Sequence, residues 1–363
     1  MPKTYLAKQL FTGHECLMNH AIQVEAGKVI AILPNEGLPE NAGPIYDIIA
    51  PAFLDIQIYG ADSKLLSVYP NADALDRLYE YCSKGGAPNF IATVATNDTK
   101  VFHQCIDAIR DYWAKGGKGC LGLHVEGPWL NPLKKGAHLE SFIHSPSKQE
   151  VLDLLEYGKG VIKIITVAPE VLESGIVNLI QAAGVTISAG HSNATYEEAT
   201  TAFDKGIGTV THLFNAMSPL QHRAPGLVGA VFNHPSVLSS VVPDGYHVDF
   251  AAIKIAWKQM GSRLFAITDA VAETATGPYP HHLVGDKYES NGILSGSALT
   301  MLKCLQNLVK DVGVPLEDAL RMVSTTPAKA IGNHSLGLIE NGLPAHLVCL
   351  NESLAIEAVI TPS

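Results

Sequence analysis

Charged side chains are scarce in this chain, and positive ones are scarcer than negative ones. Of its 363 residues 17% are charged, and 35 acidic side chains against 25 Lys and Arg give a formal net charge of −10. Phosphate backbones select basic surfaces, so no nucleic-acid partner is expected. A small anionic substrate is still compatible with this charge, because a local group of Arg and His can hold one phosphate within an acidic protein.

Long apolar stretches and paired cysteines are missing as well. No run of about 18 apolar residues occurs, which argues against a membrane span. Residues 1–10 lack the apolar stretch of a secretory signal peptide. The six cysteines are scattered and form no CxxC pair, which is typical of reduced, buried thiols. We therefore expect a cytoplasmic protein with no membrane partner.

The middle of the chain has the alternation of an α/β barrel. Apolar residues make up 47% of the chain, and between residues 51 and 334 apolar, β-rich runs alternate with segments of helical spacing. Asn71 and either Ser192 or Asn193 are the expected N-caps of two helices. Eight alternations favour a closed (β/α)8 TIM barrel over an open sheet. The expected strands are 52–58, 90–95, 121–125, 161–167, 185–189, 209–213, 238–242 and 264–268.

The two ends of the chain have a different character. Short apolar runs near both ends are separated by turn residues such as Gly27, Pro34 and Gly342. Chain ends often meet in space. We therefore predict a small β-sandwich domain from residues 1–50 and 335–363, joined to a catalytic barrel over residues 51–334.

Ionisable side chains stand where four of the expected strands end. Strand three ends in Glu126, strand five in His191, strand six in His212 and strand eight in Asp269. In a TIM barrel the C-terminal ends of all strands lie on one rim, and this rim carries the active site. Each residue alone could be an ordinary structural one, but the four together are expected to converge on one site.

This set of residue types is suited to metal-dependent hydrolysis. Two imidazoles and a carboxylate suffice to hold a divalent metal with an open coordination position, so Glu126, His191 and His212 are the candidate ligands. Asp269 is the candidate general base and acid. His138, twelve residues after Glu126, is the candidate donor to the charge that develops on a carbonyl. The ligand types suit Zn²⁺ and also tolerate Fe²⁺, Mn²⁺ or Co²⁺.

One further motif suggests a different chemistry. Residues 190–194 come close to the GxSxG nucleophile elbow and lie between an expected strand and an expected helix. A serine hydrolase would then use Ser192, with Asp269 and either His281 or His282 as its partners. That alternative leaves Glu126 and His212 without a role.

Segments distributed over most of the chain carry a family resemblance. They are HVEGPWLN at 124–131, KKGAH at 134–138, SAGHSNAT at 188–195, THLFNAM at 211–217, RAPGLVGA at 223–230, DGYHVD at 244–249, TDA at 268–270 and LSGS at 294–297. In this order they resemble the N-acetylglucosamine-6-phosphate deacetylases, a family of the amidohydrolase superfamily. The resemblance implies a homodimer that hydrolyses the acetamide of N-acetyl-D-glucosamine 6-phosphate to D-glucosamine 6-phosphate and acetate.

The resemblance also implies residue roles. The metal ligands and Asp269 keep the roles given above, and His138 assists the acetyl carbonyl. His247 contacts the sugar, and Arg223 holds the phosphate with the backbone of Asn215 and Ala216. The substrate-binding residues implied are Gln57, Ala137, Asn215, Ala216, Arg223, His247, Leu294, Ser295 and Gly296.

The chain departs from the superfamily at the end of strand one. Many amidohydrolases carry HxH there, which supports a second metal, whereas Gln57 and Tyr59 occupy those positions here. Lys163 stands too early in strand four to suggest a bridging carbamate. We therefore expect one metal ion. Two alternatives remain open besides the serine hydrolase: a deacetylase of the galactosamine analogue, and a barrel that has lost catalysis.

Overall fold

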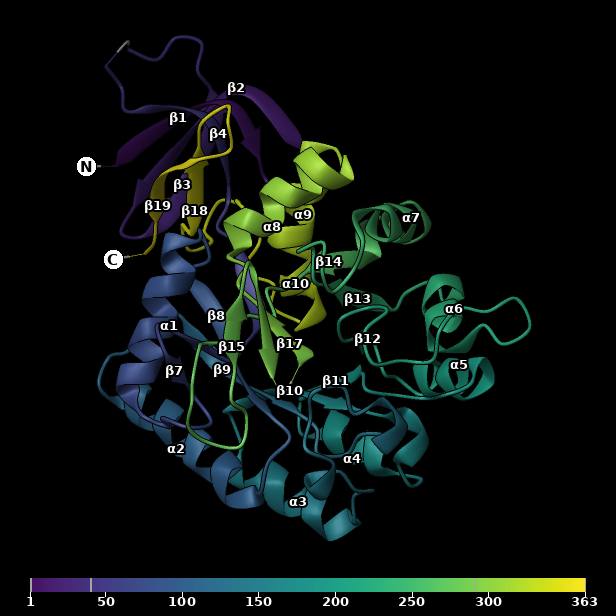
Figure 1. The fold of residues 1–363 in the computed structure, drawn as a ribbon. Coiled ribbons are helices and arrows are strands. Elements are labelled where there is room, and N and C mark those ends of the chain that lie inside the picture. Colours follow the sequence, from purple (N-terminus) through teal and green to yellow (C-terminus); the bar gives the residue numbers. More distant parts are fainter. Residues whose placement is uncertain (1, 40, 291, 363) are drawn as a thin grey trace.

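The computed structural model describes residues 2–39, 41–290 and 292–362, and its centre is a parallel barrel (Figure 1). Eight strands pair in the order β14-β13-β12-β11-β10-β9-β8-β5, which confirms the predicted (β/α)8 architecture. These strands are β5 (Leu54–Ile58), β8 (Asn89–Ala95), β9 (Cys120–Glu126), β10 (Ile162–Val167), β11 (Thr186–Ala189), β12 (Thr209–Val210), β13 (Leu238–Val241) and β14 (Leu264–Ala266).

Side chains and backbone following β14 close the ring against β5. Thr268 donates its hydroxyl and its backbone N–H to the carboxylate of Asp55. The N–H of Asp269 then donates to the carbonyl of Gln57 over 3.0 Å. Because these bonds join the first strand to the last, barrel closure fixes the backbone of Asp269 on the inner rim.

Helices surround the barrel and explain why its strands are apolar on both faces. All five residues of β5 are buried. The helices are α1 (Ala72–Lys84), α2 (Thr99–Ala114), α3 (Lys148–Tyr157), α4 (Ile176–Ala182), α5 (Tyr196–Asp204), α6 (Gly226–Asn233), α7 (Phe250–Met260), α8 (Met301–Asn307), α9 (Leu316–Val323) and α10 (Thr325–Ala330). None of them, within the described ranges, has both the length and the apolar composition needed to cross a bilayer.

One predicted helix cap is confirmed and another is wrong. The side chain of Asn71 accepts the N–H of Ala74 and caps α1 as expected. Helix α5, however, is capped by Thr195, which forms a reciprocal capping box with Glu198. Ser192 cannot cap this helix, because the helix begins later and the serine hydroxyl is bonded elsewhere.

The two chain ends meet in one mixed sheet, in the order β19-β18-β4-β1-β2-β3 (Figure 1). Its strands are β1 (Lys3–Phe11), β2 (Cys16–Glu25), β3 (Lys28–Pro34), β4 (Ile45–Pro51), β18 (Leu347–Leu350) and β19 (Ile356–Ile360). We predicted a sandwich, but these strands pair into a single sheet. The barrel covers one face of this sheet, where a sandwich would have a second sheet. Ile48 and Ala50 pack into the barrel core, while Ile49 between them packs into a separate core on the other face.

Two small hairpin structures border the barrel mouth, and the sequence did not predict either. The strands β15 (His282–Val284), β16 (Lys287–Ser290) and β17 (Ile293–Ser297) form an antiparallel flap between β14 and α8. The second hairpin pairs β6 (Gly60–Ala61) with β7 (Lys64–Leu65), directly after β5. Both therefore lie on segments that follow barrel strands at the rim where an active site is expected.

The carboxyl group that closes the barrel predicts a pH effect on stability. Burial raises the pKa of Asp55 to about 7, despite the donors from Thr268 and Gln57 that oppose this shift. A carboxyl whose pKa is raised on folding adds to the free energy of unfolding. This stabilisation is complete below the pKa of the unfolded state and is lost as the pH rises through the pKa of the folded state. Asp55→Asn removes the titration and leaves an acceptor oxygen for the two backbone donors.

We therefore expect Asp55→Asn to gain stability relative to the unmodified protein between about pH 4 and about pH 7, by on the order of 4 kcal/mol, and no further above this range. Urea unfolding at a series of pH values measures the difference. A difference that does not change with pH would contradict the raised pKa.

Candidate active site

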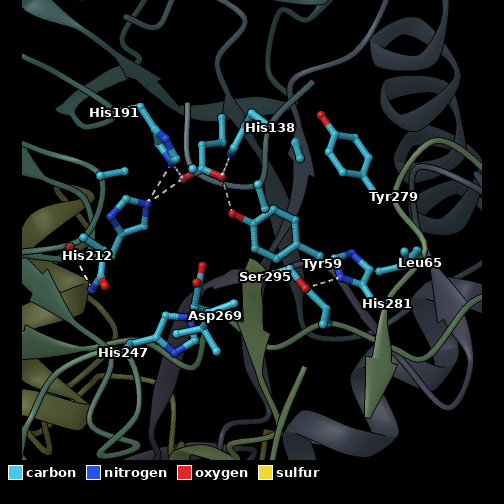
Figure 2. A pocket seen from close by; sticks show the side chains of 18 of the residues that line it. Tyr59, Leu65, His138, His191, His212, His247, Asp269, Tyr279, His281 and Ser295 are labelled. Atoms are coloured by element: carbon cyan, nitrogen blue, oxygen red, sulfur yellow. Dashed lines mark hydrogen bonds and ion pairs between the residues drawn. The ribbon is translucent and has the colours of Figure 1, made fainter. Parts of the chain in front are cut away.

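A pocket opens at the C-terminal rim of the barrel and contains all four rim residues predicted from the sequence. It encloses about 870 Å³, part of it open to solvent, which is within the usual range for small-molecule sites. Figure 2 shows His191 and His212 on one side, Asp269 below them, and Tyr59 and Tyr279 on the other side. The predicted convergence of residues from four strand ends is therefore observed.

Three of the rim residues have a backbone conformation that is unusual for non-glycine residues. His191, His212 and Asp269 have φ values of 47°, 38° and 54°, and each follows shortly after a barrel strand. Such residues cost free energy and cluster at functional sites. The left-handed residue ends the strand, which is why β12 stops at Val210 rather than at the predicted residue 213.

Glu126, His191 and His212 form a buried group whose geometry fits a divalent metal. Oε1 of Glu126 lies 3.1 Å from Nε2 of His212 and 3.4 Å from Nε2 of His191, and the two Nε2 atoms are 3.1 Å apart. A tetrahedral ion with ligand bonds of about 2.0–2.1 Å requires ligand spacings of roughly 3.3 Å. The three atoms therefore form a triangle of the size of one tetrahedral face.

The hydrogen bonds and charges around this triangle suit ligation. Nδ1 of His191 lies 2.8 Å from the carbonyl of Lys134, which can only accept, so Nδ1 carries the proton and Nε2 is the ligand atom. Burial lowers the pKa of His191 to about 4, which keeps the ring neutral. Burial alone would raise the pKa of Glu126, but the charge of His138 and the bonds from three imidazoles lower it well below its ordinary value.

Gln57 and Tyr59 occupy the position of the missing HxH pair and hold the two site carboxylates. Nε2 of Gln57 is 2.7 Å from Oδ1 of Asp269, 3.3 Å from Oε1 of Glu126 and 2.9 Å from the Tyr59 hydroxyl. Tyr59 donates its hydroxyl to the other oxygen of Glu126. Burial and the charge of Glu126 raise the pKa of this phenol well above its ordinary value, so it stays a donor.

Asp269 lies beside the triangle and faces the pocket (Figure 2). Burial raises the pKa of its carboxyl above the ordinary value, against the opposing effect of His212. A carboxyl with a raised pKa is suited to both accepting and returning a proton near neutral pH. Since Gln57 holds one of its oxygens, the other is left toward the pocket.

His138 reaches the site from the loop after β9. Its Nε2 is 3.1 Å from Oε2 of Glu126, and its Nδ1 is 2.7 Å from the hydroxyl of Thr96. The ring is buried and lies with its centroid 4.3 Å from that of His191. His138 thus presents one nitrogen to the pocket, directly beside the candidate metal ligands.

The opposite side of the pocket carries the residues expected to bind a sugar phosphate. Nδ1 of His247 is 2.6 Å from Oδ2 of Asp244, which leaves Nε2 for a ligand. Asn215 and Ala216 line the pocket, and within the described residues the N–H of Ala216 donates to no other group, whereas that of Asn215 donates to His212. Ala216 thus offers a backbone donor.

The remaining predicted substrate residues differ in their placement. Ala137, Leu294 and Ser295 line the pocket. Gly296 lies behind it, where an added Cβ would approach Val271 to 2.5 Å. Arg223 is exposed and does not line the pocket, and none of the lining side chains in the described part of the chain is Lys or Arg. Gln57 does not line it either, since it contacts the site carboxylates from below.

The structure contradicts the serine-hydrolase alternative. The Ser192 hydroxyl donates to Oε2 of Glu170 over 2.7 Å, and no imidazole contacts it within the described ranges. Glu170 also accepts the N–H of Asn193 and the side-chain amide of Asn131, so it anchors the loops on both sides of His191. His281 instead faces Ser295 over 2.9 Å. Ser192 is therefore a structural residue.

Several pocket residues were not predicted as part of the site. Tyr59, Leu65 and Val271 form an apolar patch at one end, and Tyr279 and His281 come from the segment that leads into the flap. The sequence carried a signal for Tyr59, which occupies a position where related barrels have histidine, and it offered His281 only as a partner of Ser192. The others lie on loops whose course the strand pattern does not fix.

Comparison with known proteins identifies relatives over nearly the full chain. A model described as "Amidohydrolase family" matches residues 48–361. The N-acetylglucosamine-6-phosphate deacetylase of Haemophilus influenzae is 31% identical over 93% of this chain and 92% of its own length. The N-acetylgalactosamine-6-phosphate deacetylase of a Shewanella species is 29% identical over 86% of this chain and 81% of its own.

Solved structures of related proteins have the same fold. An N-acetylglucosamine-6-phosphate deacetylase from Pasteurella multocida superposes with a TM-score of 0.91 at 32% identity, covering 99% of this chain and 98% of that one. A mutant of the Mycobacterium smegmatis deacetylase, in complex with N-acetyl-D-glucosamine-6-phosphate, has a TM-score of 0.91 at 28% identity, with the same coverage.

The ligand triangle predicts how metal content depends on single residues. His191→Asn removes one of three ligand atoms, so we expect the bound metal to fall from about one ion per chain to a small fraction of that. Atomic spectrometry after gel filtration measures it. The exposed His144, changed to Asn, is the matched control and should leave the metal content unchanged. Full metal content in His191→Asn would exclude this site.

Proposed function

The chain belongs to the amidohydrolase family, and from that premise we propose that it hydrolyses N-acetyl-D-glucosamine 6-phosphate to D-glucosamine 6-phosphate and acetate. The observation that carries the proposal is the buried triangle of Glu126, His191 and His212 with Asp269 beside it. A divalent ion held by these three residues supplies Lewis acidity, which lowers the pKa of water and polarises a carbonyl.

The proton transfers are the task of the protein's own side chains. Asp269 takes the proton of the attacking water and then delivers it to the departing nitrogen, for which its raised pKa is suited. His138 donates from Nε2 to the acetyl oxygen as negative charge develops there. Gln57 keeps Asp269 in place through the 2.7 Å bond to Oδ1.

The sugar and its phosphate occupy the side of the pocket opposite Tyr59. His247, oriented by Asp244, contacts the sugar, and the N–H of Ala216 binds the phosphate. Arg223 supplies the positive charge, since the lining itself has no Lys or Arg among the described residues. It is exposed on the segment that follows Ala216, so it must swing inward or act across a dimer interface. A planar guanidinium suits phosphate oxygens.

A homodimer, a single metal ion and the cytosol complete the proposal. Leu133 and Leu220, near the pocket loops, are 78% and 54% exposed, and a partner chain would cover such side chains. The donors from Gln57 and Tyr59 replace the ligands of a second metal, which favours one ion. Zn²⁺ fits two imidazoles and a carboxylate best. The six free cysteines, five of them buried, are consistent with a reducing compartment.

Acetate release from purified protein tests the reaction and its substrate. We expect hydrolysis of N-acetyl-D-glucosamine 6-phosphate, loss of activity on chelation, recovery with Zn²⁺, and a much lower kcat/KM for the unphosphorylated sugar. Arg223→Ala should remove most of the preference for the phosphate. The galactosamine analogue, assayed in parallel, decides between the two relatives: a higher kcat/KM for it would transfer the proposal to that substrate.

Exchanging the acid–base residue tests the mechanism. Asp269→Asn keeps the shape of the side chain but cannot carry the proton, so we expect kcat to fall by about 10²- to 10⁴-fold with metal content unchanged. Ser192→Ala serves as the control and should lower kcat only slightly, because that serine bonds to Glu170. Turnover of Asp269→Asn at the normal rate would refute the proposed role.

A further inference from the structure

Thr96 lies at the end of β8, behind the pocket, where three rim segments meet. The residue is fully buried and does not line the pocket. Its hydroxyl stands between the backbone of Glu126, to whose carbonyl it donates over 3.1 Å, and the ring of His138, whose Nδ1 is 2.7 Å away. One hydroxyl thus contacts both a candidate metal ligand's backbone and the candidate carbonyl donor.

The proton count of this hydroxyl fixes the direction of its bonds. A hydroxyl has one proton and can accept with its lone pairs, whereas a carbonyl oxygen can only accept. The proton of Thr96 therefore goes to Glu126, and Thr96 must accept from His138. Nδ1 of His138 consequently carries a proton. Nε2 lies 3.1 Å from Oε2 of Glu126, which can only accept, so Nε2 carries a proton as well and is the nitrogen that can donate to a substrate carbonyl.

The surrounding backbone is shaped to admit this contact. Gly127 has φ 82°, and a Cβ added to it would lie 2.1 Å from the Thr96 hydroxyl oxygen, so only glycine leaves the space. Tyr279 donates its hydroxyl over 2.5 Å to the carbonyl of Thr96 and accepts the N–H of Leu139, the neighbour of His138. The Tyr279 hydroxyl therefore holds in place the backbone at Thr96 and the backbone next to His138.

We propose that Thr96 is a positioning residue of the deacetylation reaction: its hydroxyl holds the proton on Nδ1 of His138 and fixes the ring so that Nε2 meets the substrate carbonyl. The inference rests on the proposed function through the role of His138. The group that orients a working imidazole determines which nitrogen faces the reaction, and small displacements of such a ring are costly.

Three substitutions test the proposal by steady-state kinetics. Thr96→Val keeps the shape but removes the hydroxyl, so we expect kcat to fall on the order of 10- to 100-fold with KM within about two-fold. Thr96→Ser restores the hydroxyl and should recover most of kcat. Thr209→Val is the matched control, because Thr209 is also buried in a barrel strand and donates to a backbone carbonyl. It should leave kcat nearly unchanged.

A double-mutant cycle separates a role through His138 from general disruption. If Thr96 acts through that ring, Thr96→Val has no further effect on kcat in a His138→Gln background. Equal losses in both backgrounds, or a kcat of Thr96→Val within about two-fold of normal at full metal content, overturn the proposal.

A spectroscopic measurement keeps the test independent of both activity and variant folding. Nitrogen-15 NMR of the histidine rings distinguishes protonated from unprotonated ring nitrogens, and His138→Gln identifies the signals of residue 138. We expect Nδ1 to be protonated in the unmodified protein, and an unprotonated Nδ1 refutes the inference. If no acetate is released from the sugar phosphate, the proposed function fails. The NMR measurement still shows whether Nδ1 of His138 donates to the hydroxyl of Thr96.

Discussion

The buried carboxylate of Glu126 is the constraint on which the site depends. Only 1% of the residue is exposed, and an ionised carboxylate removed from water must be compensated by donors or cations on every side. Gln57 and Tyr59 approach it from the end of strand β5, and three imidazoles approach it from the loop after β9 and from the ends of β11 and β12. Segments from four places in the chain are thereby held in one arrangement, and the same charges keep the carboxylate ionised and available to a metal.

Much of the site could be predicted because barrel geometry determines where the residues at the strand ends lie. Parallel strands end on a common rim, so reading the residues at the strand ends was enough to bring Glu126, His191, His212 and Asp269 together from positions up to 143 residues apart. The eight strands themselves were recognisable as apolar runs, because burial on both faces leaves little room for polar side chains. The prediction that these residues bind a metal rested on their types, two imidazoles and a carboxylate, and not on any single motif.

Other features depend on information that a strand pattern does not contain. The left-handed residue that shortens β12 is His212 and not a glycine, so nothing in the sequence marks it as a break. The terminal strands were expected to form a sandwich, because alternation indicates that a face is buried but not what buries it. Gln57 was expected to touch the substrate, and its contacts with Glu126 and Asp269 appear only once the barrel is closed. The flap and Arg223 lie on loops, whose course is set by tertiary contacts.

The pairing of the two chain ends has a consequence for biosynthesis. Strand β4 bonds on one side to β1 and on the other to β18, which is separated from it by the whole barrel. While the chain grows from its N-terminus, β1 to β4 leave the ribosome before the barrel does, and β4 keeps an open edge until β18 has been made. An unpaired edge invites association with other chains. The edge of β4 is therefore exposed for as long as the whole barrel takes to be synthesised, until β18 pairs with it.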